Sequence, residues 1–181
     1  MDSAFFIDLK LRIGFDARDA DNLHSLWELV QPSVDAVSRQ FHEWLLRDPV
    51  ARGVFTGGEE QIASQRRAFS NWTTDLFHGS YDFEYFQRRI DIGRTHVRVG
   101  MPQHYMLTAM EMVWEILGKL VRDSGAPDAD AKLASLHRLL ALETAVMLES
   151  YKEVYSQRLR EEERTVAEEK LTQSEHLAQI G

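Results

Sequence analysis

Seven histidines are the side chains of this chain best suited to hold a metal or a cofactor, because its 181 residues include no cysteine. Disulfides, thiolate metal sites, thiol nucleophiles and covalent haem attachment through C-x-x-C-H are therefore excluded. A metal or cofactor must instead be held by histidine, carboxylate, tyrosine or methionine. The histidines are His24, His42, His78, His96, His104, His137 and His176.

His96 lies in an apolar helical stretch that ends at Gly100-Met101-Pro102. It follows Ile92 by four residues and precedes Val99 by three, so it shares their apolar helix face. A buried imidazole without a partner would cost about 1–3 kcal/mol, so this ring must bond to something. The residues alone leave two interpretations. His96 is either a hydrogen-bonded core or boundary histidine, or an axial ligand that gives one nitrogen to a haem iron.

The sequence predicts no enzymatic activity for residues 1–181. It contains none of the motifs G-x-x-x-x-G-K-[ST], G-x-G-x-x-G, H-E-x-x-H and G-x-S-x-G. Its acidic residues fall mostly on predicted solvent faces and form no isolated pair within an apolar run, where a raised pKa would favour acid–base chemistry.

Charge and hydropathy exclude two classes of partner. The formal net charge of −8 and the pI near 5.4 argue against nucleic-acid binding, because phosphate affinity comes from lysine and arginine. The chain has no run of 18 apolar residues and no basic region of a signal peptide at its start. We therefore expect no membrane partner and a cytoplasmic location.

The elements that must position the histidines are helices. Proline and glycine divide the chain into periodic segments. The segments that we expect to be helical are residues 20–30, 32–48, 59–79, 82–100, 102–125 and 129–180, with a short turn at 49–55. The opening residues 4–15 alternate apolar and less apolar side chains, which predicts a short strand or an extended arm. The expected fold class is all-α, with six to seven helices.

The last segment, 129–180, is far longer than a mean helix of about 11–12 residues and has no internal proline or glycine. Tyr155, Leu159, Glu162 and Val166 follow a 4-3-4 spacing, which is typical of a coiled coil. The alternative is a solvated helix end. We favour a dimeric coiled-coil linker, because a single helix this polar would fray.

The stretch IDIGRTHVRVGMPQHYMLTAM, residues 90–110, resembles the signature of globin-coupled sensors, which are related to the protoglobins. That family has a segment of the form I-G-x-x-H-x-x-I-G-(L/M)-x-P, then a tyrosine and a helix of small residues. The matching residues are Ile92-Gly93, His96, Val99-Gly100-Met101-Pro102 and Tyr105, with one residue fewer before the proline. A second family segment resembles VSRQFHEWLLRDP, residues 37–49, and the similarity covers residues 15–155.

The resemblance implies a globin-like helical domain that holds haem b non-covalently, with His96 as the proximal iron ligand. It implies an N-terminal extension at 1–18, a haem sensor domain at 19–155 and a helical linker at 156–181. The short helix that follows the second long helix in other globins is expected to be absent. The gas ligand would be O₂, CO or NO, and two copies would pair through a four-helix bundle.

One departure from the family pattern concerns the side of the haem opposite His96. The family has a tyrosine after the phenylalanine of the second long helix, where this chain has Phe41-His42. His42 could donate a hydrogen bond to the gas ligand, or ligate the iron itself in a six-coordinate bis-histidyl haem. In a third interpretation it points elsewhere and the alignment is shifted by one residue.

Other pocket candidates depend on helical spacing. Ile62, Gln65, Phe69 and Trp72 could form a distal wall, in which Gln65 is either a hydrogen-bond donor to ligand or a boundary residue. Tyr105 could bond on the proximal side or only pack. The apolar shell would comprise Phe41, Leu45, Phe86, Ile90, Val99, Met101 and Met106. We expect His78 and His104 at the surface or in an interface, and His24, His137 and His176 to face solvent.

The C-terminal stretch EEKLTQSEHLAQIG, residues 168–181, resembles the approach to the dimerisation helix of sensor histidine kinases. The matching residues are Leu171, Ser174, Glu175, Leu177, Ala178, Ile180 and Gly181, while His176 precedes the expected phospho-acceptor and is not it. The two resemblances together imply the gas or redox sensor part of a two-component histidine kinase. Two rivals remain: a haem-free globin-like interaction module, and a stand-alone haem protein with redox or dioxygenase activity.

Overall fold

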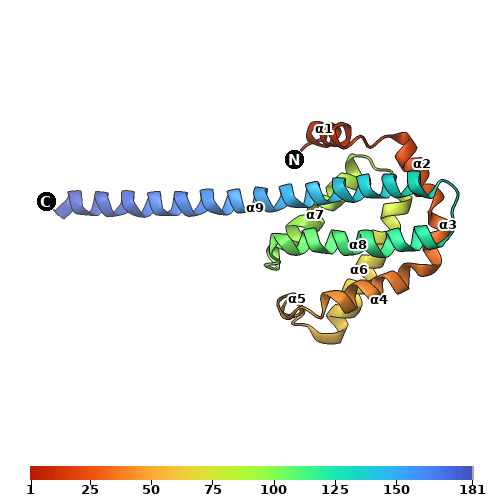
Figure 1. Ribbon diagram of the computed structural model, residues 1–181. Coiled ribbons are helices and arrows are strands. Elements are labelled where there is room, and N and C mark those ends of the chain that lie inside the picture. Colours follow the sequence, from red (N-terminus) through yellow and green to blue (C-terminus); the bar gives the residue numbers. More distant parts are fainter. Residues whose placement is uncertain (181) are drawn as a thin grey trace.

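The computed structural model describes the backbone of residues 1–180 and the side chains of residues 1–171 and 173. Within these residues every regular element is helical, so the expected all-α class is confirmed (Figure 1). The helices are α1 (Ser3–Ile13), α2 (Ala17–Ser25), α3 (Trp27–Val30), a 3₁₀ turn (Gln31–Ser33), α4 (Val34–Leu45), α5 (Pro49–Gly53), α6 (Gly58–His78), α7 (Phe83–Arg98), α8 (Gln103–Asp123) and α9 (Ala129–Ile180).

The strand or extended arm expected at the N-terminus is wrong, because residues 3–13 form helix α1. The Asp2 side chain accepts a hydrogen bond from the Phe5 amide at the helix start, and Gly14 ends the helix in a left-handed conformation. The alternating pattern predicted the wrong buried face, because it includes Ile7 and Leu11, which are exposed. The buried face instead follows helical spacing and includes Phe6.

A short helix also replaces the turn expected at residues 49–55 and corrects the expectation that no such helix follows the second long one. Asp48 accepts hydrogen bonds from the amides of Val50 at 2.8 Å and Ala51 at 3.0 Å. Pro49 occupies the first turn of α5, where its missing amide hydrogen is not needed. An N-cap and a proline therefore suffice to start this helix.

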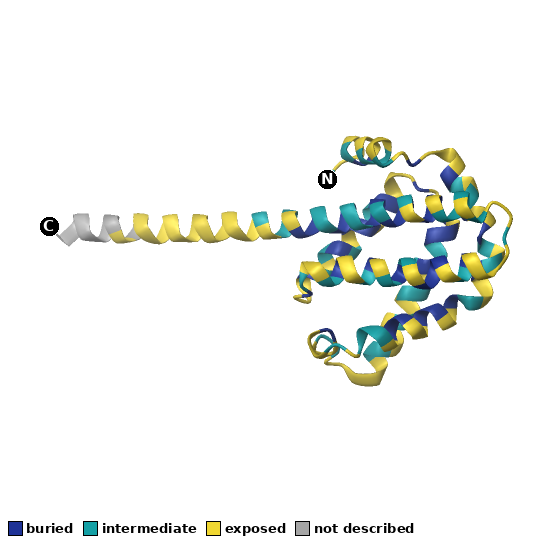
Figure 2. Ribbon diagram, viewed as in Figure 1, coloured by how far each residue is buried: buried dark blue, intermediate teal, exposed yellow. Residues whose placement is uncertain are grey.

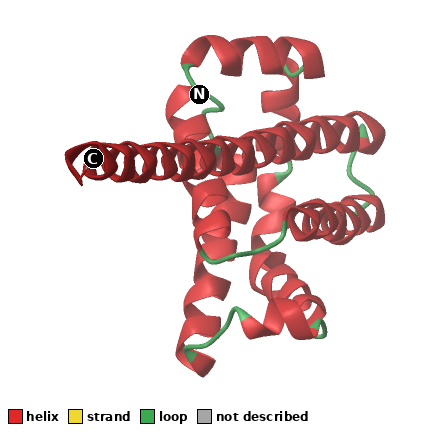
Figure 3. Cartoon of the chain, turned by 90° about the vertical axis from the view of Figure 1, so that its left-hand side faces the viewer, coloured by secondary structure: helices red, strands yellow, loops and turns green. Residues whose placement is uncertain are grey.

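Helix α9 is the element on which the domain is assembled. Helices α7 and α8 make the most extensive contacts with it, and α2 and α1 also lie against it. Helix α4 packs on α6 and on α8. Figure 3 shows α9 running across the domain, with other helices lying at an angle to it. The helix that carries His96 is thus fixed to α9, and the helix that carries His42 is fixed to α6 and α8.

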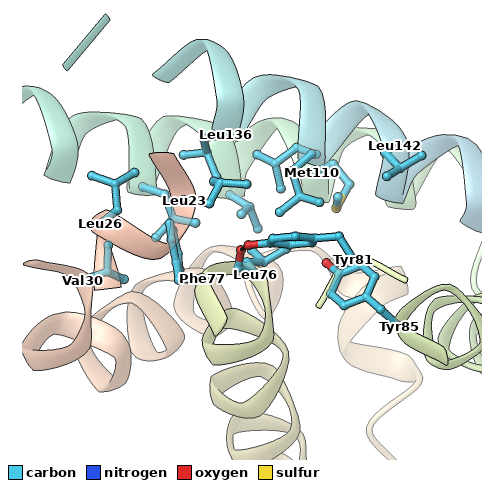
Figure 4. Packing of buried hydrophobic residues seen from close by; sticks show 14 of the residues in the cluster. Leu23, Leu26, Val30, Leu76, Phe77, Tyr81, Tyr85, Met110, Leu136 and Leu142 are labelled. Atoms are coloured by element: carbon cyan, nitrogen blue, oxygen red, sulfur yellow. Dashed lines mark hydrogen bonds between the residues drawn. The ribbon is translucent and has the colours of Figure 1, made fainter. Parts of the chain in front are cut away.

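The main core lies where these helices converge (Figure 4). It joins the N-terminal helices to α6, α8 and α9, and it also holds Tyr81 and Tyr85. Its labelled aliphatic and aromatic members are Leu23, Leu26, Val30, Leu76, Phe77, Met110, Leu136 and Leu142. A second, smaller cluster of Val97, Met106, Met147 and Tyr151 connects the end of α7 to α8 and α9.

The second half of α9 leaves the domain (Figures 1 and 2). Every side chain from residue 157 to residue 171 is exposed. Three exposed apolar residues at and beyond Tyr155 have the expected coiled-coil spacing: Tyr155 is 51% exposed, Leu159 57% and Val166 48%. The part of the tail match beyond Leu171, including His176, lies outside the described side chains.

Gly93 permits the close approach of α7 to α9. A Cβ at this position would lie 2.7 Å from the Ser150 Cβ and 3.2 Å from the Met147 Cα. We therefore expect Gly93→Ala to lower the free energy of unfolding by about 1–3 kcal/mol through overpacking. Chemical denaturation measures the loss, and Ser150→Gly in the same chain should recover part of it. A fully stable Gly93→Ala protein would contradict this packing.

Candidate functional site

His96 lies in the last turn of α7 and is half-buried. Its Nδ1 is 2.8 Å from the carbonyl oxygen of Ile92. Because a carbonyl oxygen can only accept, Nδ1 carries the proton and donates it, which leaves the lone pair of the neutral ring on Nε2. Burial lowers the pKa of His96 and so favours this neutral form, although the hydrogen bond to Ile92 opposes the shift.

His42 repeats this arrangement near the end of α4. Its Nδ1 lies 2.8 Å from the carbonyl oxygen of Ser38, four residues earlier, and the side chain is buried. Burial lowers the pKa of His42; the hydrogen bond to Ser38 opposes this, and the nearby charge of Arg66 adds to the lowering. His42 is therefore also a neutral imidazole with its lone pair on Nε2.

Neither Nε2 atom receives a hydrogen bond from the side chains that the structure describes. Tying Nδ1 to a backbone carbonyl fixes the tautomer and the ring orientation, and it makes the other nitrogen a better ligand. An iron porphyrin brings four nitrogen donors of its own and needs one or two axial ligands. The two histidines fit such a group, His96 from α7 and His42 from α4.

An aromatic cluster surrounds His42. The ring of Phe69, on α6, stacks on the Phe41 ring with 4.3 Å between the ring centroids. It meets the His42 ring edge to face, with 5.7 Å between the centroids. Phe41 lies 5.5 Å from His42 in a similar orientation, and Trp72 extends the cluster along α6. Of the sequence candidates, the structure thus brings Phe41, His42 and Phe69 together.

The charge of Arg66, a residue of α6 that was not predicted from the sequence, acts on His42. Gln65 is exposed, because the face of α6 toward α4 follows Ile62, Arg66 and Phe69 at 4-3 spacing. The Ser38 hydroxyl donates to the Arg66 carbonyl at 3.1 Å, and the Arg66 Nε is buried without a hydrogen-bond partner. Helical spacing from Ile62 to Phe69 allows either Gln65 or Arg66 on this face, so the sequence gives no signal that selects Arg66.

Met101 and Tyr105, the two remaining candidates, lie around the α7–α8 corner. The Met101 amide donates to the His96 carbonyl at 3.0 Å, and its own carbonyl accepts the Tyr151 hydroxyl at 2.9 Å. Tyr105 donates its hydroxyl to Asp48 at 2.7 Å and so joins the start of α8 to the α4–α5 corner. Neither Met101 nor Tyr105 contacts the His42 cluster in any hydrogen bond or ring contact of the described residues.

The expected apolar shell is only partly assembled. Val99 is 48% exposed, because α7 has ended and the backbone turns away at Gly100. Phe86 stacks on Phe6 of α1 at 4.5 Å, and Met106 belongs to the smaller cluster with Tyr151. Of the other histidines, His24, His78, His104 and His137 are exposed, as expected.

The contact between Tyr151 and Met101 fixes the corner after His96 to α9. We expect Tyr151→Phe to lower the free energy of unfolding by about 1–3 kcal/mol, because the buried Met101 carbonyl loses its partner. Thermal unfolding measures the effect. Tyr155→Phe, which removes a hydroxyl from a half-exposed ring one turn later, is the matched control and should change little. Equal stability of the two variants would contradict the assignment.

A buried polar cluster around Glu143 of α9 was also missed. Glu143 is 1% exposed and accepts hydrogen bonds from Trp72 Nε1 at 3.1 Å, from Arg89 Nε at 2.7 Å and from the Tyr85 hydroxyl. Arg89 is 2% exposed and also contacts Asp75 at 3.2 Å. A lone glutamate in a long helix gives no sequence signal, because only tertiary packing brings its three partners together.

The fold and sequence have known relatives. The globin domain of a Geobacter sulfurreducens globin-coupled sensor superposes with a TM-score of 0.75 at 26% identity, over 80% of this chain and 95% of that domain. The ferric globin domain of E. coli DosC superposes with a TM-score of 0.64 at 16% identity, over 83% of this chain and 99% of that one. The globin-like fold expected from the sequence is therefore confirmed.

A curated relative in Halobacterium salinarum, described as the heme-based aerotactic transducer HemAT, is 22% identical over 169 residues. The match covers 86% of this chain but only 35% of that protein. None of the helices in the described part of the chain is long and apolar enough to cross a membrane. The Protoglobin family profile matches residues 6–157, which is most of the chain, and the chain therefore belongs to the Protoglobin family.

Proposed function

We propose that this chain is a haem-based gas sensor domain in which His96 is the proximal iron ligand. The observation that carries the proposal is that a protoglobin fold holds two neutral histidines of the same local geometry, one on α4 and one on α7. In each ring Nδ1 donates to a backbone carbonyl, and Nε2 makes no hydrogen bond within the described part of the chain. The names of the relatives, a haem-based transducer and a globin-coupled sensor, support the same function.

The residues of this chain would hold haem b without a covalent bond, since the chain has no cysteine. His96 would hold the iron from α7. When bound, the haem supplies an iron centre that takes a diatomic gas such as O₂, CO or NO. The aromatic rings of Phe41 and Phe69 exclude water around His42, which can either donate a hydrogen bond toward the gas or ligate the iron itself.

The output of the sensor would travel through α9. Helix α7 is fastened to α9 by the Ser150 hydroxyl, which lies 3.4 Å from the Ile90 carbonyl, and by Arg94, which binds Glu153 at 2.9 Å. A shift of the His96 helix would therefore move α9 directly. A second, indirect route would lead from α7 through the Met101-Pro102 connection to α8, which packs on α9. A coupling free energy of about 1–3 kcal/mol is enough for such a switch.

We further propose that the parent protein is a cytoplasmic, dimeric histidine kinase of a two-component system. Helices α8 and α9 of two copies would form a four-helix bundle, and the exposed Tyr155, Leu159 and Val166 would continue it as a coiled coil. The kinase-like residues 168–181 support this choice of transmitter. Phosphotransfer would belong to that linked domain, and residues 1–181 would carry no catalytic step.

Absorption spectra of the purified protein, ferric and dithionite-reduced, test the proposal. Hemin is added to the protein, and unbound hemin is then removed by gel filtration. We expect the protein to keep a Soret absorption band after this step. Split α and β bands in the reduced protein that disappear in His42→Ala would show His42 as the second axial ligand. A five-coordinate reduced spectrum in both proteins, with faster CO or O₂ dissociation in His42→Ala, would show a hydrogen-bond donor. No Soret band after hemin addition would exclude the haem function and leave a globin-like interaction module.

A further inference from the structure

We propose that Glu143 is a positioning residue that sets where the His96 helix stands relative to the wall around His42. Its carboxylate joins α6, α7 and α9 at one buried point, and so controls whether His42 and His96 address the same iron. This inference rests on the proposed haem function and adds a buried residue that acts through its hydrogen bonds to Trp72, Tyr85 and Arg89.

Three helices meet at the Glu143 carboxylate. Trp72 donates from α6, and Arg89 and Tyr85 donate from α7. The Arg89 guanidinium lies over the Tyr85 ring at 4.0 Å, which orients it toward the carboxylate. Hydrogen bonds to a charged acceptor are directional and short, so they fix the spacing and rotation of α6 and α7 on α9.

The same two helices carry His96, on α7, and Phe69, on α6, whose ring contacts the His42 ring of α4. Arg89 precedes His96 by seven residues, which is about two helical turns, so both occupy nearly the same face of α7. Trp72 follows Phe69 by three residues on α6, and the Phe69 ring contacts the His42 ring. A rotation of α7 or α6 at Glu143 therefore changes the approach of His96 or of the His42 wall.

The cluster is not the arrangement that would maximise stability. The Arg89 Nη2 atom is buried without a hydrogen-bond partner, and burying an ion pair removes two charges from water. A well-packed apolar pair of similar volume is often as stable or more so. What an apolar pair lacks is the directional geometry, which is the property that a positioning role requires.

Glu143→Gln is the main test, because it keeps the side-chain shape but cannot neutralise Arg89. We expect the variant to bind haem and to change the ratio of six- to five-coordinate iron by about threefold or more, the size of a coupling between neighbouring residues. Where the wild-type iron is fully five-coordinate, the readout is the C–O stretching frequency of the ferrous CO complex, which reports the distance of the distal imidazole. Tyr85→Phe, which removes one donor only, should shift the same quantity in the same direction by less.

Asp19→Asn is the matched control. Asp19 is also a buried carboxylate that ties a helix to α9, since it accepts from Ser135 Oγ at 2.7 Å and from Arg138 Nη1 at 2.8 Å. In these bonds Asp19 joins α2 to α9 and contacts neither α6 nor α7. The Asp19→Asn variant should therefore have a lower melting temperature but an unchanged haem absorption spectrum.

The outcomes separate this inference from the proposed function. A spectral shift in Glu143→Gln and Tyr85→Phe but not in Asp19→Asn supports the positioning role. Wild-type spectra in both cluster variants overturn it, even where their melting temperatures fall. If Glu143→Gln does not fold, the result of Tyr85→Phe decides. A wild-type protein that binds no hemin refutes the haem function itself, on which the inference rests.

Discussion

His96→Ala is expected to lower the affinity for hemin by about two orders of magnitude or more. Loss of a residue that only supports a metal ligand typically lowers affinity 10–100-fold, so loss of the ligand should do at least as much. Titration of the purified protein with hemin, followed by the Soret absorbance, measures the change. His96 is half-buried at the end of α7, so the substitution leaves the two core clusters intact and the protein should still fold.

His104→Ala is the control for this titration. His104 is an exposed histidine eight residues further along, and its ring contacts only Tyr105 among the described aromatic side chains. Hemin affinity should stay at the wild-type value. If His104→Ala lost haem and His96→Ala kept it, the proximal assignment would be wrong.

Glu143→Leu is expected to cause the largest loss of stability of any single substitution considered. The change leaves the Arg89 guanidinium buried beside an apolar side chain, and breaking a buried ion pair in this way costs about 3–5 kcal/mol. Asp75 offers Arg89 a second carboxylate at 3.2 Å, but that carboxylate is itself partly exposed and compensates little. Guanidinium denaturation followed by far-ultraviolet circular dichroism measures the loss.

The double variant Arg89→Leu, Glu143→Leu separates the broken pair from the packing around it. Removing both charges leaves no uncompensated ion, so we expect it to recover part of the stability lost in Glu143→Leu. Recovery is incomplete because the Tyr85 hydroxyl and Trp72 Nε1 still lack their acceptor. A double variant as unstable as the single one would show that the pair itself, and not the orphaned charge, stabilises the domain. Its haem spectrum should still differ from wild type, since the directional contacts to α6 and α7 are gone.

The expected helical organisation depended on local signals. Proline and glycine between segments, and apolar residues at 3.6-residue spacing, predicted α6 to α9 nearly to their ends. The same kind of signal failed for α1, where Phe5, Ile7, Leu9, Leu11 and Ile13 satisfy an alternating and a helical pattern at once. Burial of Phe6 against Phe86 decides between them, and that contact joins residues eighty positions apart.

In the candidate site, too, some residues were predicted from the sequence and others depend on the tertiary structure. The resemblance in residues 90–110 predicts His96 as the iron ligand, and the 37–49 segment pointed to His42, because both lie within stretches of family-like spacing. The rotation of each helix about its axis decides three further findings. Arg66 and not Gln65 faces α4, the Tyr105 hydroxyl bonds to Asp48, and Val99 is exposed. A shift of one residue rotates a side chain by about 100°, which spacing alone does not resolve.

From the amino-acid sequence it follows that this chain is a helical domain without thiol chemistry, and the sequence also predicts that His96 and His42 hold an iron. Composition and local periodicity carry the first of these conclusions, because each depends on neighbouring residues only, whereas His96 and His42 were chosen through the resemblance to globin-coupled sensors. Only the tertiary structure decided that α9 is the helix to which the His96 helix is fastened, and that Glu143 gathers Trp72, Tyr85 and Arg89. Those contacts join residues 54 or more positions apart, where burial and hydrogen-bond geometry, and not helix propensity, select the partners.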